Sequence, residues 1–160
     1  MKNALMFSKA SDEWSTPLDF FSALDAEFGF DVDAAATLDN RLKDEYFGLD
    51  HHRSERRDAL AADWGGKVCW LNMPYSMCRE FIAKAAQEAA KGCTVVCLVP
   101  SRTDTRWWHD HVWDCVRHQP RPGVEVRFIK GRLTFGGAKA GAPFPSVVIV
   151  FRPPSRRPAC

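Results

Sequence analysis

Two apolar runs with a helical pattern between them constrain the fold of this 160-residue chain more than any other feature. Lys67 to Leu71 and Cys93 to Val99 are compact and apolar, as strands buried on both faces of a sheet are. Between them, apolar residues recur at helical spacing from Met77 to Ala89, after a possible cap at Ser76 and before Gly92. This order of strand, helix and strand predicts a parallel pair joined by a crossover helix.

The remaining segments extend this alternation. Thr16, Pro17 and Asp19 form a helix start, with a side-chain cap, a proline at the first helical position and a carboxylate near the dipole. The polar stretch from Leu38 to Arg57 has only weak periodicity. Further elements are predicted as a helix from Pro17 to about Phe28, a strand from Phe30 to Asp33, a helix from Thr103 or Asp104 to about His118, and strands from Val124 to Ile129 and from Val147 to Phe151.

These elements predict a Rossmann-like α/β sandwich in one domain spanning residues 1–152, followed by a basic Pro/Arg tail at residues 153–160. The sheet should be mostly parallel, with helices on both faces. The last two strands, which have no helix between them, should form an antiparallel closing hairpin. In such sheets ligands bind beyond the carboxyl ends of the strands, where Asp33, Asn72 and Pro100 fall.

Composition and charge exclude some classes of protein. A hydrophobic fraction of 46% with 26% charged residues is ordinary for a globular chain and argues against extensive disorder. The net charge of +2 says little by itself. Basic residues are nevertheless denser in the second half of the chain, which permits a polyanionic partner.

The start of the chain and its cysteines favour a cytoplasmic location. Lys2 and Lys9 interrupt the first apolar stretch, which therefore matches neither a signal peptide nor a membrane span. Among the six cysteines, Cys69, Cys93 and Cys97 lie in apolar runs, and no pair has Cys-x-x-Cys spacing. We expect reduced, mostly buried thiols.

The segment Asn72-Met73-Pro74-Tyr75 follows a predicted buried strand and precedes a predicted helix, so a rigid turn displays its polar groups at the edge of the sheet. It resembles the Asp/Asn-Pro-Pro-Tyr motif of amino-group methyltransferases, and its surroundings resemble the small phage-type DNA N-6-adenine methyltransferase family. The resemblance covers most of the chain. It is carried by Trp14-Ser15-Thr16-Pro17, Phe30 to Ala35, Val68 to Tyr75, Val99 to Trp107 with His109, Gly131 to Phe135, and Ala142 to Ser146.

This resemblance implies a methyltransferase sandwich that uses S-adenosylmethionine to methylate the exocyclic amine of an adenine flipped out of double-stranded DNA. The adenine amine is a poor nucleophile, because its lone pair is delocalised into the ring. The Asn72 side-chain oxygen and the main-chain carbonyl of Met73 would accept its two hydrogens, and Tyr75 would stack on the base. Positioning and electrostatic stabilisation would supply most of the acceleration, without a metal.

Position 73 departs from the family, which has proline where this chain has Met73. The acceptor proposed there belongs to the main chain and survives the change. Methionine lacks the fixed φ of proline, so the turn Asn72-Met73-Pro74-Tyr75 is expected to be less rigid.

The cofactor contacts implied by the resemblance lie on several segments. The segment Asp33-Ala34-Ala35-Ala36 stands where many methyltransferases have a glycine-rich loop, and its small side chains, Ala34 among them, permit close approach of the cofactor. Asp33 would lie beside the methionine part or the ribose. Asp58 is a candidate acceptor for the adenine amine of the cofactor, and equally a capping or solvated carboxylate. A wall of the site is expected from Trp14, Thr16 and Pro17.

DNA binding requires cations for the phosphates, and we favour Arg102 and Arg106, just beyond a strand end. The neighbouring aromatic pattern, including Trp108 and Val112, can also be core. The glycine-rich loop from Arg132 to Pro145, which carries Lys139, is either a mobile arm over DNA or a flexible hairpin connection. The basic tail from Arg152 to Arg157 leaves the same choice.

Other activities fit the sequence less well. His109-Asp110-His111 and His51-His52 invite a metal site, but no completing ligand can be argued. A Gly-x-Ser-x-Gly nucleophile turn is missing. The alternatives that stay open are methylation of a cytosine amine or a glutamine amide, and a catalytically silent nucleic-acid-binding module. A domain of this size predicts a short or relaxed DNA recognition sequence.

Overall fold

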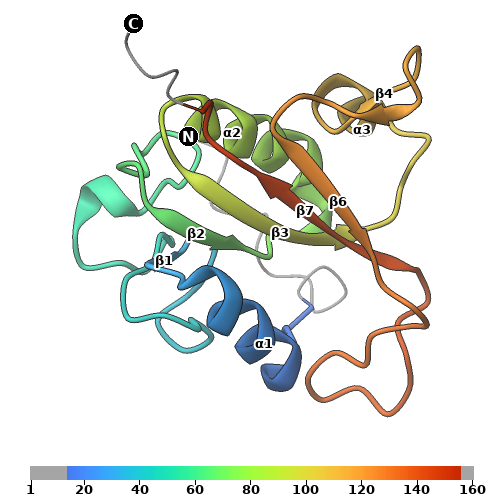
Figure 1. Ribbon diagram of the computed structural model, residues 1–160. Coiled ribbons are helices and arrows are strands. Elements are labelled where there is room, and N and C mark those ends of the chain that lie inside the picture. The colour runs from blue at the N-terminus through green and yellow to red at the C-terminus, as the bar shows by residue number, and fades with distance from the viewer. Residues whose placement is uncertain (1–13, 156–160) are drawn as a thin grey trace, which may run out of the picture.

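A five-stranded sheet in the order β1-β2-β3-β7-β6 forms the centre of the computed structural model, which describes residues 14–155 (Figure 1). The strands β1, β2 and β3 pair in parallel, and β7 is antiparallel to both β3 and β6. Four of the five strands therefore point the same way, and β6 and β7 form the expected closing hairpin. The strands are β1 (Val32–Asp33), β2 (Val68–Leu71), β3 (Thr94–Pro100), β6 (Val124–Phe128) and β7 (Ser146–Phe151).

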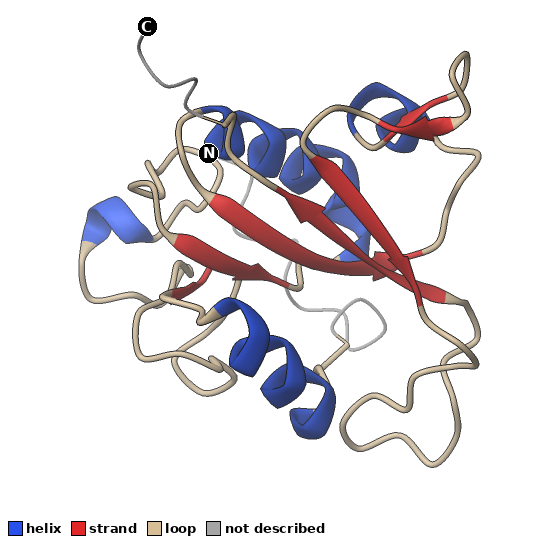
Figure 2. Cartoon of the chain, viewed as in Figure 1, coloured by secondary structure: helices blue, strands red, loops and turns tan. Residues whose placement is uncertain are grey.

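Helices cover both faces of this sheet (Figure 2). One face carries α1 (Leu18–Phe28), and the other carries α2 (Cys78–Ala90), against which the short α3 (Arg106–His111) packs. The layers agree with a mixed α/β sandwich and are compatible with a Rossmann-like fold. The remaining elements are two 3-10 turns, η1 (Ser54–Arg56) and η2 (Tyr75–Met77), and a separate antiparallel pair, β4 (Trp113–Asp114) with β5 (Gln119–Pro120).

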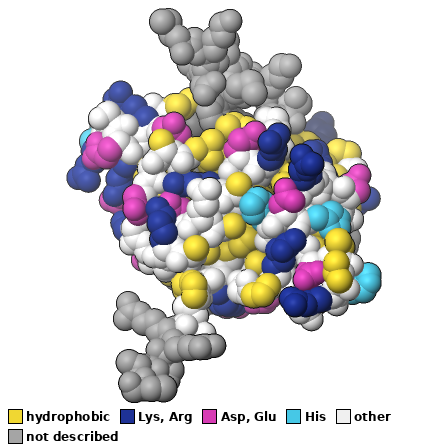
Figure 3. Space-filling model, turned by 90° about the horizontal axis from the view of Figure 1, so that it is seen from above, with side chains coloured by type: hydrophobic (Ala, Val, Ile, Leu, Met, Phe, Trp, Pro, Cys, Tyr) yellow, Lys and Arg dark blue, Asp and Glu magenta, His cyan; other side chains and the backbone are white. Residues whose placement is uncertain are grey.

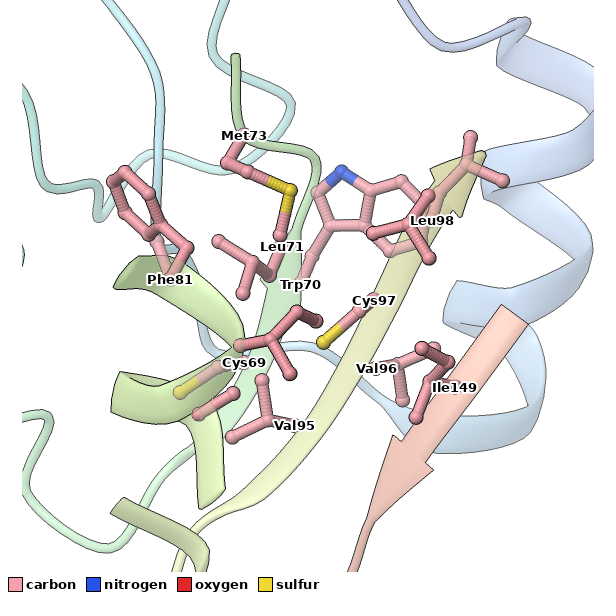
Figure 4. Close-up of a cluster of buried hydrophobic side chains, with 14 of the residues drawn as sticks. Cys69, Trp70, Leu71, Met73, Phe81, Val95, Val96, Cys97, Leu98 and Ile149 are labelled. Carbon is pink, nitrogen blue, oxygen red and sulfur yellow. The ribbon is translucent and has the colours of Figure 1, made fainter. Parts of the chain in front are cut away.

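Alternation along β2 divides the core between the two faces. The Trp70 ring packs edge-on against Phe21 of α1, with ring centroids 5.4 Å apart. Figure 4 shows Cys69 and Leu71 on the side of β2 that carries Phe81 of α2, while the Trp70 ring lies on the opposite side of β2. Side chains of β2 therefore alternate between the α1 face and the α2 face, which fixes where each residue after β2 points.

The cysteines within residues 14–155 are free thiols, as expected. Cys69, Cys78, Cys93 and Cys97 are buried, and Cys115 is exposed. Burial raises the pKa of the Cys97 thiol well above its usual range, so this thiol stays protonated and unreactive.

The N-caps predicted for α1 and α2 are wrong. Pro17, not Thr16, is the N-cap of α1, which begins at Leu18. Ser76 lies in the 3-10 turn η2, and α2 begins at Cys78 without a side-chain hydrogen bond at its cap. The Thr16 hydroxyl bonds a side chain instead of a helix N–H, and that bond belongs to the site described below.

The predicted helix from Thr103 or Asp104 to His118 is also wrong beyond its first turns. The helix α3 ends at His111, and β4 and β5 follow it. The Arg121 guanidinium donates to the His109 carbonyl at 2.9 and 2.6 Å, which satisfies an acceptor at the helix end. Asp114 Oδ1 accepts the N–H groups of Val116 and Arg117, which makes a local turn in place of a further helical turn.

The polar stretch from Leu38 to Arg57 runs along the edge of β1. Tyr46 forms an isolated parallel bridge with Asp33, and the Phe47 N–H donates to the Asp33 carbonyl at 2.9 Å. A Cβ at Gly48 would lie 1.8 Å from the Ala36 carbonyl oxygen, so only glycine fits there. This close approach explains how a segment without periodicity takes a defined path.

Candidate active site

The carboxyl ends of β1, β2 and β3 meet at one edge of the sheet, and the reversed β7 begins at the same edge. Residues 14–155 contain four buried side-chain polar atoms without a hydrogen-bond partner, and three of these belong to Asn72, Tyr75 and Ser146 at this edge. The fourth is His109 Nδ1 on α3. Buried polar atoms normally have partners, so a cluster of exceptions marks a candidate ligand site.

Asn72 directly follows β2 and is held through its amide nitrogen. Its Nδ2 donates to the Trp14 carbonyl oxygen at 2.6 Å and to the Thr16 hydroxyl oxygen at 2.9 Å. A carbonyl oxygen only accepts hydrogen bonds, so this contact fixes which end of the amide is the nitrogen. The Asn72 Oδ1 atom is therefore a buried acceptor with a fixed orientation and no partner within the described residues.

Tyr75 and Met73 are both buried, with 4% and 2% of their surface exposed. Burial raises the pKa of the Tyr75 hydroxyl above its usual range, the Cys78 thiol adds to this, and the nearby Arg102 cation opposes it. Met73 lies just above Leu71 in the core (Figure 4), with its sulfur 4.0 Å from the Cys78 sulfur. The motif thus sends Asn72 to the α1 face and the Met73 side chain into the core, while buried Pro74 precedes η2.

Aromatic side chains from the connection between β6 and β7 lie over Tyr75. The Tyr75 ring makes edge contacts with Phe135 and Phe144, at centroid distances of 6.5 and 5.6 Å. Trp14 contacts the same two rings at 5.3 and 5.1 Å. The Gly136 N–H donates to the Ser15 carbonyl at 2.9 Å, so backbone contacts also hold this loop against the segment before α1.

Asp33 ends β1 and is buried on the same edge. Its carboxylate accepts the Leu42 N–H at 3.1 Å and the Ala35 N–H at 3.4 Å. Burial nevertheless raises the pKa of Asp33 to about 7, with these two hydrogen bonds opposing the rise. Ala34, the next residue, is fully buried and donates its N–H to the Trp70 carbonyl at 2.8 Å.

The other residues predicted to contact the cofactor have structural roles of their own. Trp14 and Thr16 hold Asn72, and Pro17 is the N-cap residue of α1. Asp58 is exposed, and its Oδ1 accepts the N–H groups of Leu60 and Ala61 in a local turn, as expected for a solvated or capping carboxylate. These contacts leave the cofactor roles as predictions.

The predicted DNA-contacting cations are all exposed. Arg102 lies close enough to Tyr75 to affect the pKa of its hydroxyl, and Arg106 lines a groove of about 440 Å³ between α2 and α3. Arg132 and Lys139 lie on the loop that carries Phe135. On the face viewed in Figure 3, basic, acidic and histidine side chains are interspersed, without a uniformly basic patch.

Trp108 and Val112 are buried, with 2% and no exposed surface, so the core alternative for this aromatic pattern is confirmed. The basic tail extends past Ser155, and Arg156 and Arg157 lie outside the described residues. Within residues 14–155, no group of three or more histidine, cysteine or acidic residues is placed to hold a metal ion. No helix in that range has the length and apolarity that crossing a membrane requires.

Phe135, Phe144 and Ser146 were not assigned roles from the sequence, although their segments carried the resemblance. The aromatic pair flanks a glycine-rich stretch, and this pattern is a usable signal for a loop that packs on a site. The orphaned hydroxyl of Ser146 has no such signal, because its position depends on the reversed direction of β7.

The fold and this edge define an α/β protein with a candidate ligand site at the carboxyl ends of a mostly parallel sheet. Residues 4–157 match the model of a family described as DNA N-6-adenine-methyltransferase (Dam). The chain therefore belongs to this family of adenine-specific DNA methyltransferases.

Two curated relatives carry the same description, DNA N-6-adenine-methyltransferase, and both come from phages. The protein of Haemophilus phage HP1 is 28% identical over 157 residues, covering 91% of this chain and 83% of its own length. The protein of Escherichia phage T1 is 31% identical over 99 residues, which are 61% of this chain and 39% of that protein. The chain thus matches less than half of the T1 protein.

Proposed function

We propose that this chain transfers a methyl group from S-adenosylmethionine to the N6 amine of an adenine flipped out of double-stranded DNA. The observation that carries the proposal is Asn72 Oδ1, a buried acceptor held in place from its nitrogen side. An acceptor kept without a partner costs about 1–3 kcal/mol. A substrate N–H group that fills this position explains why the chain keeps it.

The reaction needs two acceptors for the two amine hydrogens, so that the nitrogen lone pair is released from the ring. Asn72 Oδ1 takes one hydrogen and the Met73 main-chain carbonyl takes the other. The Tyr75 ring stacks on the base. Because Trp14 and Thr16 fix the Asn72 amide before substrate arrives, little reorganisation is needed at the moment of reaction.

The residues near β1 fit a cationic methyl donor. Asp33 is a buried carboxyl group with a pKa of about 7, and a neighbouring positive charge would favour its ionised form. The small side chain of Ala34 permits close approach, and Trp14, Thr16 and Pro17 form the wall on the α1 side. Asp58 Oδ2 accepts a hydrogen bond from the adenine amine of S-adenosylmethionine. When bound, S-adenosylmethionine supplies the electrophilic methyl group.

Access to a base in duplex DNA requires flipping and cations for the flanking phosphates. Arg102 and Arg106 supply these cations beyond the end of β3, and Arg132 and Lys139 supply them from the β6–β7 loop. Because this domain is small, we expect it to read a short or relaxed DNA sequence. Sequencing of methylated positions in treated DNA tests this, and selection of a long, strict site contradicts it.

The Asn72→Ala variant tests the site. We expect methyl transfer to fall at least about 100-fold, as when one preorganised hydrogen-bonding group is removed from other active sites. Asn72→Asp should also be impaired, because a carboxylate cannot donate to the Trp14 carbonyl. Ser22→Ala, an exposed change on α1, is the control and should keep full activity. Wild-type activity in Asn72→Ala would remove the basis of the proposal.

The same preparations decide between the alternatives. Digestion of treated DNA to nucleosides should give N6-methyladenine, whereas methylcytosine alone would move the reaction to another planar amine. Methylation of a glutamine amide would label protein in place of DNA. Calorimetry with S-adenosylmethionine should give heat of binding, and DNA binding without it would indicate a catalytically silent module.

A further inference from the structure

Ser146, the first residue of β7, has a buried hydroxyl that the proposed reaction does not use. Only 2% of the residue is exposed, and its Oγ has no hydrogen-bond partner within residues 14–155. Its backbone pairs with Pro100, the last residue of β3. An alanine would fill this position without leaving a buried polar atom unsatisfied, so packing alone does not account for a serine.

The register of the sheet places Ser146 on the same face as Asn72. Trp70 pairs with Val96, and Asn72 is two residues beyond Trp70 along the chain. Ser146 pairs with Pro100, which is four residues beyond Val96 and therefore on the same face of β3. Trp70 packs on Phe21 of α1, so Asn72 and Ser146 both point to the α1 side.

The two residues lie on either side of β3, because β2 and β7 are its neighbours. Adjacent strands are about 4.8 Å apart, so roughly 10 Å separates the β2 and β7 backbones. The Asn72 and Ser146 side chains extend into this gap from either side. A purine that hydrogen-bonds one of them through its amine and the other through its ring fills the remaining distance. Asp33 of β1 pairs with Trp70 of β2, and β1 lies on the side of β2 away from β3. Asp33, the candidate cofactor-binding residue, and Ser146 therefore lie on opposite sides of Asn72.

We propose that the Ser146 hydroxyl donates a hydrogen bond to a ring nitrogen of the flipped adenine while Asn72 Oδ1 accepts from its amine. The inference rests on the proposed function and adds a residue that recognises the base. The Ser146 hydroxyl then donates to a ring nitrogen of adenine, and Asn72 Oδ1 accepts from the amine. The two side chains contact the edge of the base from two directions. Phe144, two residues earlier, then contributes to the wall beside the bound base.

The test is a cycle of enzyme and substrate variants. Ser146→Ala and the wild type are assayed on DNA carrying adenine, and on DNA in which one adenine ring nitrogen at a time is replaced by C–H. We expect Ser146→Ala to lower kcat/KM on adenine about tenfold, the order of one neutral hydrogen bond. One of the analogues should lower wild-type kcat/KM by a similar factor and cause no further loss in Ser146→Ala.

Thr94→Val is the matched control, because Thr94 lies at the opposite end of β3 in the same sheet. It should leave the response to every analogue unchanged. The melting temperature of Ser146→Ala should equal or exceed that of the wild type, since the variant removes an orphaned hydroxyl.

Two results overturn the inference. One is an unchanged kcat/KM for Ser146→Ala on adenine, and the other is losses that simply add for every analogue. Both require an active wild-type enzyme. Absence of methylation by the wild type would instead count against the proposed function, so the two failures are distinguishable.

Discussion

Several residues at this sheet edge have buried polar groups that lower the stability of the folded protein when no ligand is bound. Asn72 uses its nitrogen for support and leaves its oxygen unpaired, and Tyr75 and Ser146 bury hydroxyl groups without partners. Asp33 buries a carboxyl group whose pKa of about 7 lies far above its usual value of 3.8. Such departures are expected where a site is organised for a substrate before it binds.

Asp33 makes stability depend on pH. Because its folded pKa is raised, the folded state keeps a proton that the unfolded state has lost between about pH 4 and pH 7. Stability is therefore expected to fall as pH rises through this window, by up to about 4 kcal/mol, and to level off above it. Urea unfolding at a series of pH values measures this, and Asp33→Asn should flatten the slope.

A cationic cofactor beside Asp33 should lower the pKa of its carboxyl group, because the positive charge favours the ionised form. Binding of S-adenosylmethionine near pH 7 is then expected to release a proton and to strengthen between pH 6 and pH 8. Calorimetry in buffers of different ionisation enthalpy detects the proton. Equal heats in all buffers, with unchanged affinity across this range, would separate Asp33 from the cofactor.

Met73 has a side chain in the core and a proposed role in the main chain. Met73→Pro is expected to lower the free energy of unfolding by about 1–3 kcal/mol, because it removes buried side-chain atoms. Methyl transfer per folded molecule should be preserved or improved, since proline stiffens the turn. Urea unfolding and kcat measured well below the melting temperature separate the two effects.

The control for this change is Met73→Leu, which keeps volume and should cost less stability. A Met73→Pro enzyme that folds and binds cofactor but has lost methyl transfer would show that the turn needs a backbone conformation that proline does not allow.

Among the elements, the loop between β6 and β7 matters most for access to the site. Its Phe135 and Phe144 rings cover Tyr75, so this loop must shift before a base can stack there. The backbone bond between Gly136 and Ser15 closes the loop against the segment before α1. Both alternatives drawn from the sequence, a mobile arm and a hairpin connection, are consistent with this position.

A disulfide tests whether the loop opens. A Cβ at Gly136 would lie 3.4 Å from the Ser15 Cβ, close to the separation found in disulfides. In a background with Cys115→Ser and Cys160→Ser, the Ser15→Cys, Gly136→Cys variant should lose methyl transfer when oxidised and regain it when reduced. Each single cysteine variant is the control, and full activity of the oxidised form would show that the loop stays in place during turnover.

At the scale of the whole fold, some of the described arginines hold elements together and others are exposed near the site. Arg127 on β6 forms bidentate bonds with Glu27 of α1 at 2.7 and 2.6 Å and also pairs with Glu125. These hydrogen bonds raise the pKa of Arg127 above its usual range. Arg102 is exposed at the end of β3, beside Tyr75.

Salt dependence of DNA binding should separate the two kinds of arginine. Arg102→Ala is expected to reduce the slope of log affinity against log salt by about 1, the value of one lost phosphate contact. Arg127→Ala should leave the slope unchanged and lower stability by about 1 kcal/mol. Fluorescence anisotropy over a range of salt concentrations measures both, and equal slopes for the two variants would contradict this division.

Local sequence patterns were enough to predict the elements of this protein whose formation depends on neighbouring residues. The apolar runs of β2 and β3 and the periodicity of α2 depend on residues close in the chain, so a window of sequence contains the signal. The same local patterns placed Asn72 and Asp33 at strand ends. Local caps were less predictable, because Thr16 had a choice between a helix N–H and the distant Asn72 amide.

Features that depend on contacts between distant segments could be seen only in the folded structure. The sequence favoured a long helix after Thr103, but bonds from Arg121 to His109 end it at His111. Only the packing of Phe135 and Phe144 on Tyr75 closes the site, and only the reversal of β7 brings Ser146 to the edge that holds Asn72. These pairings join residues far apart in sequence, and no local periodicity encodes them.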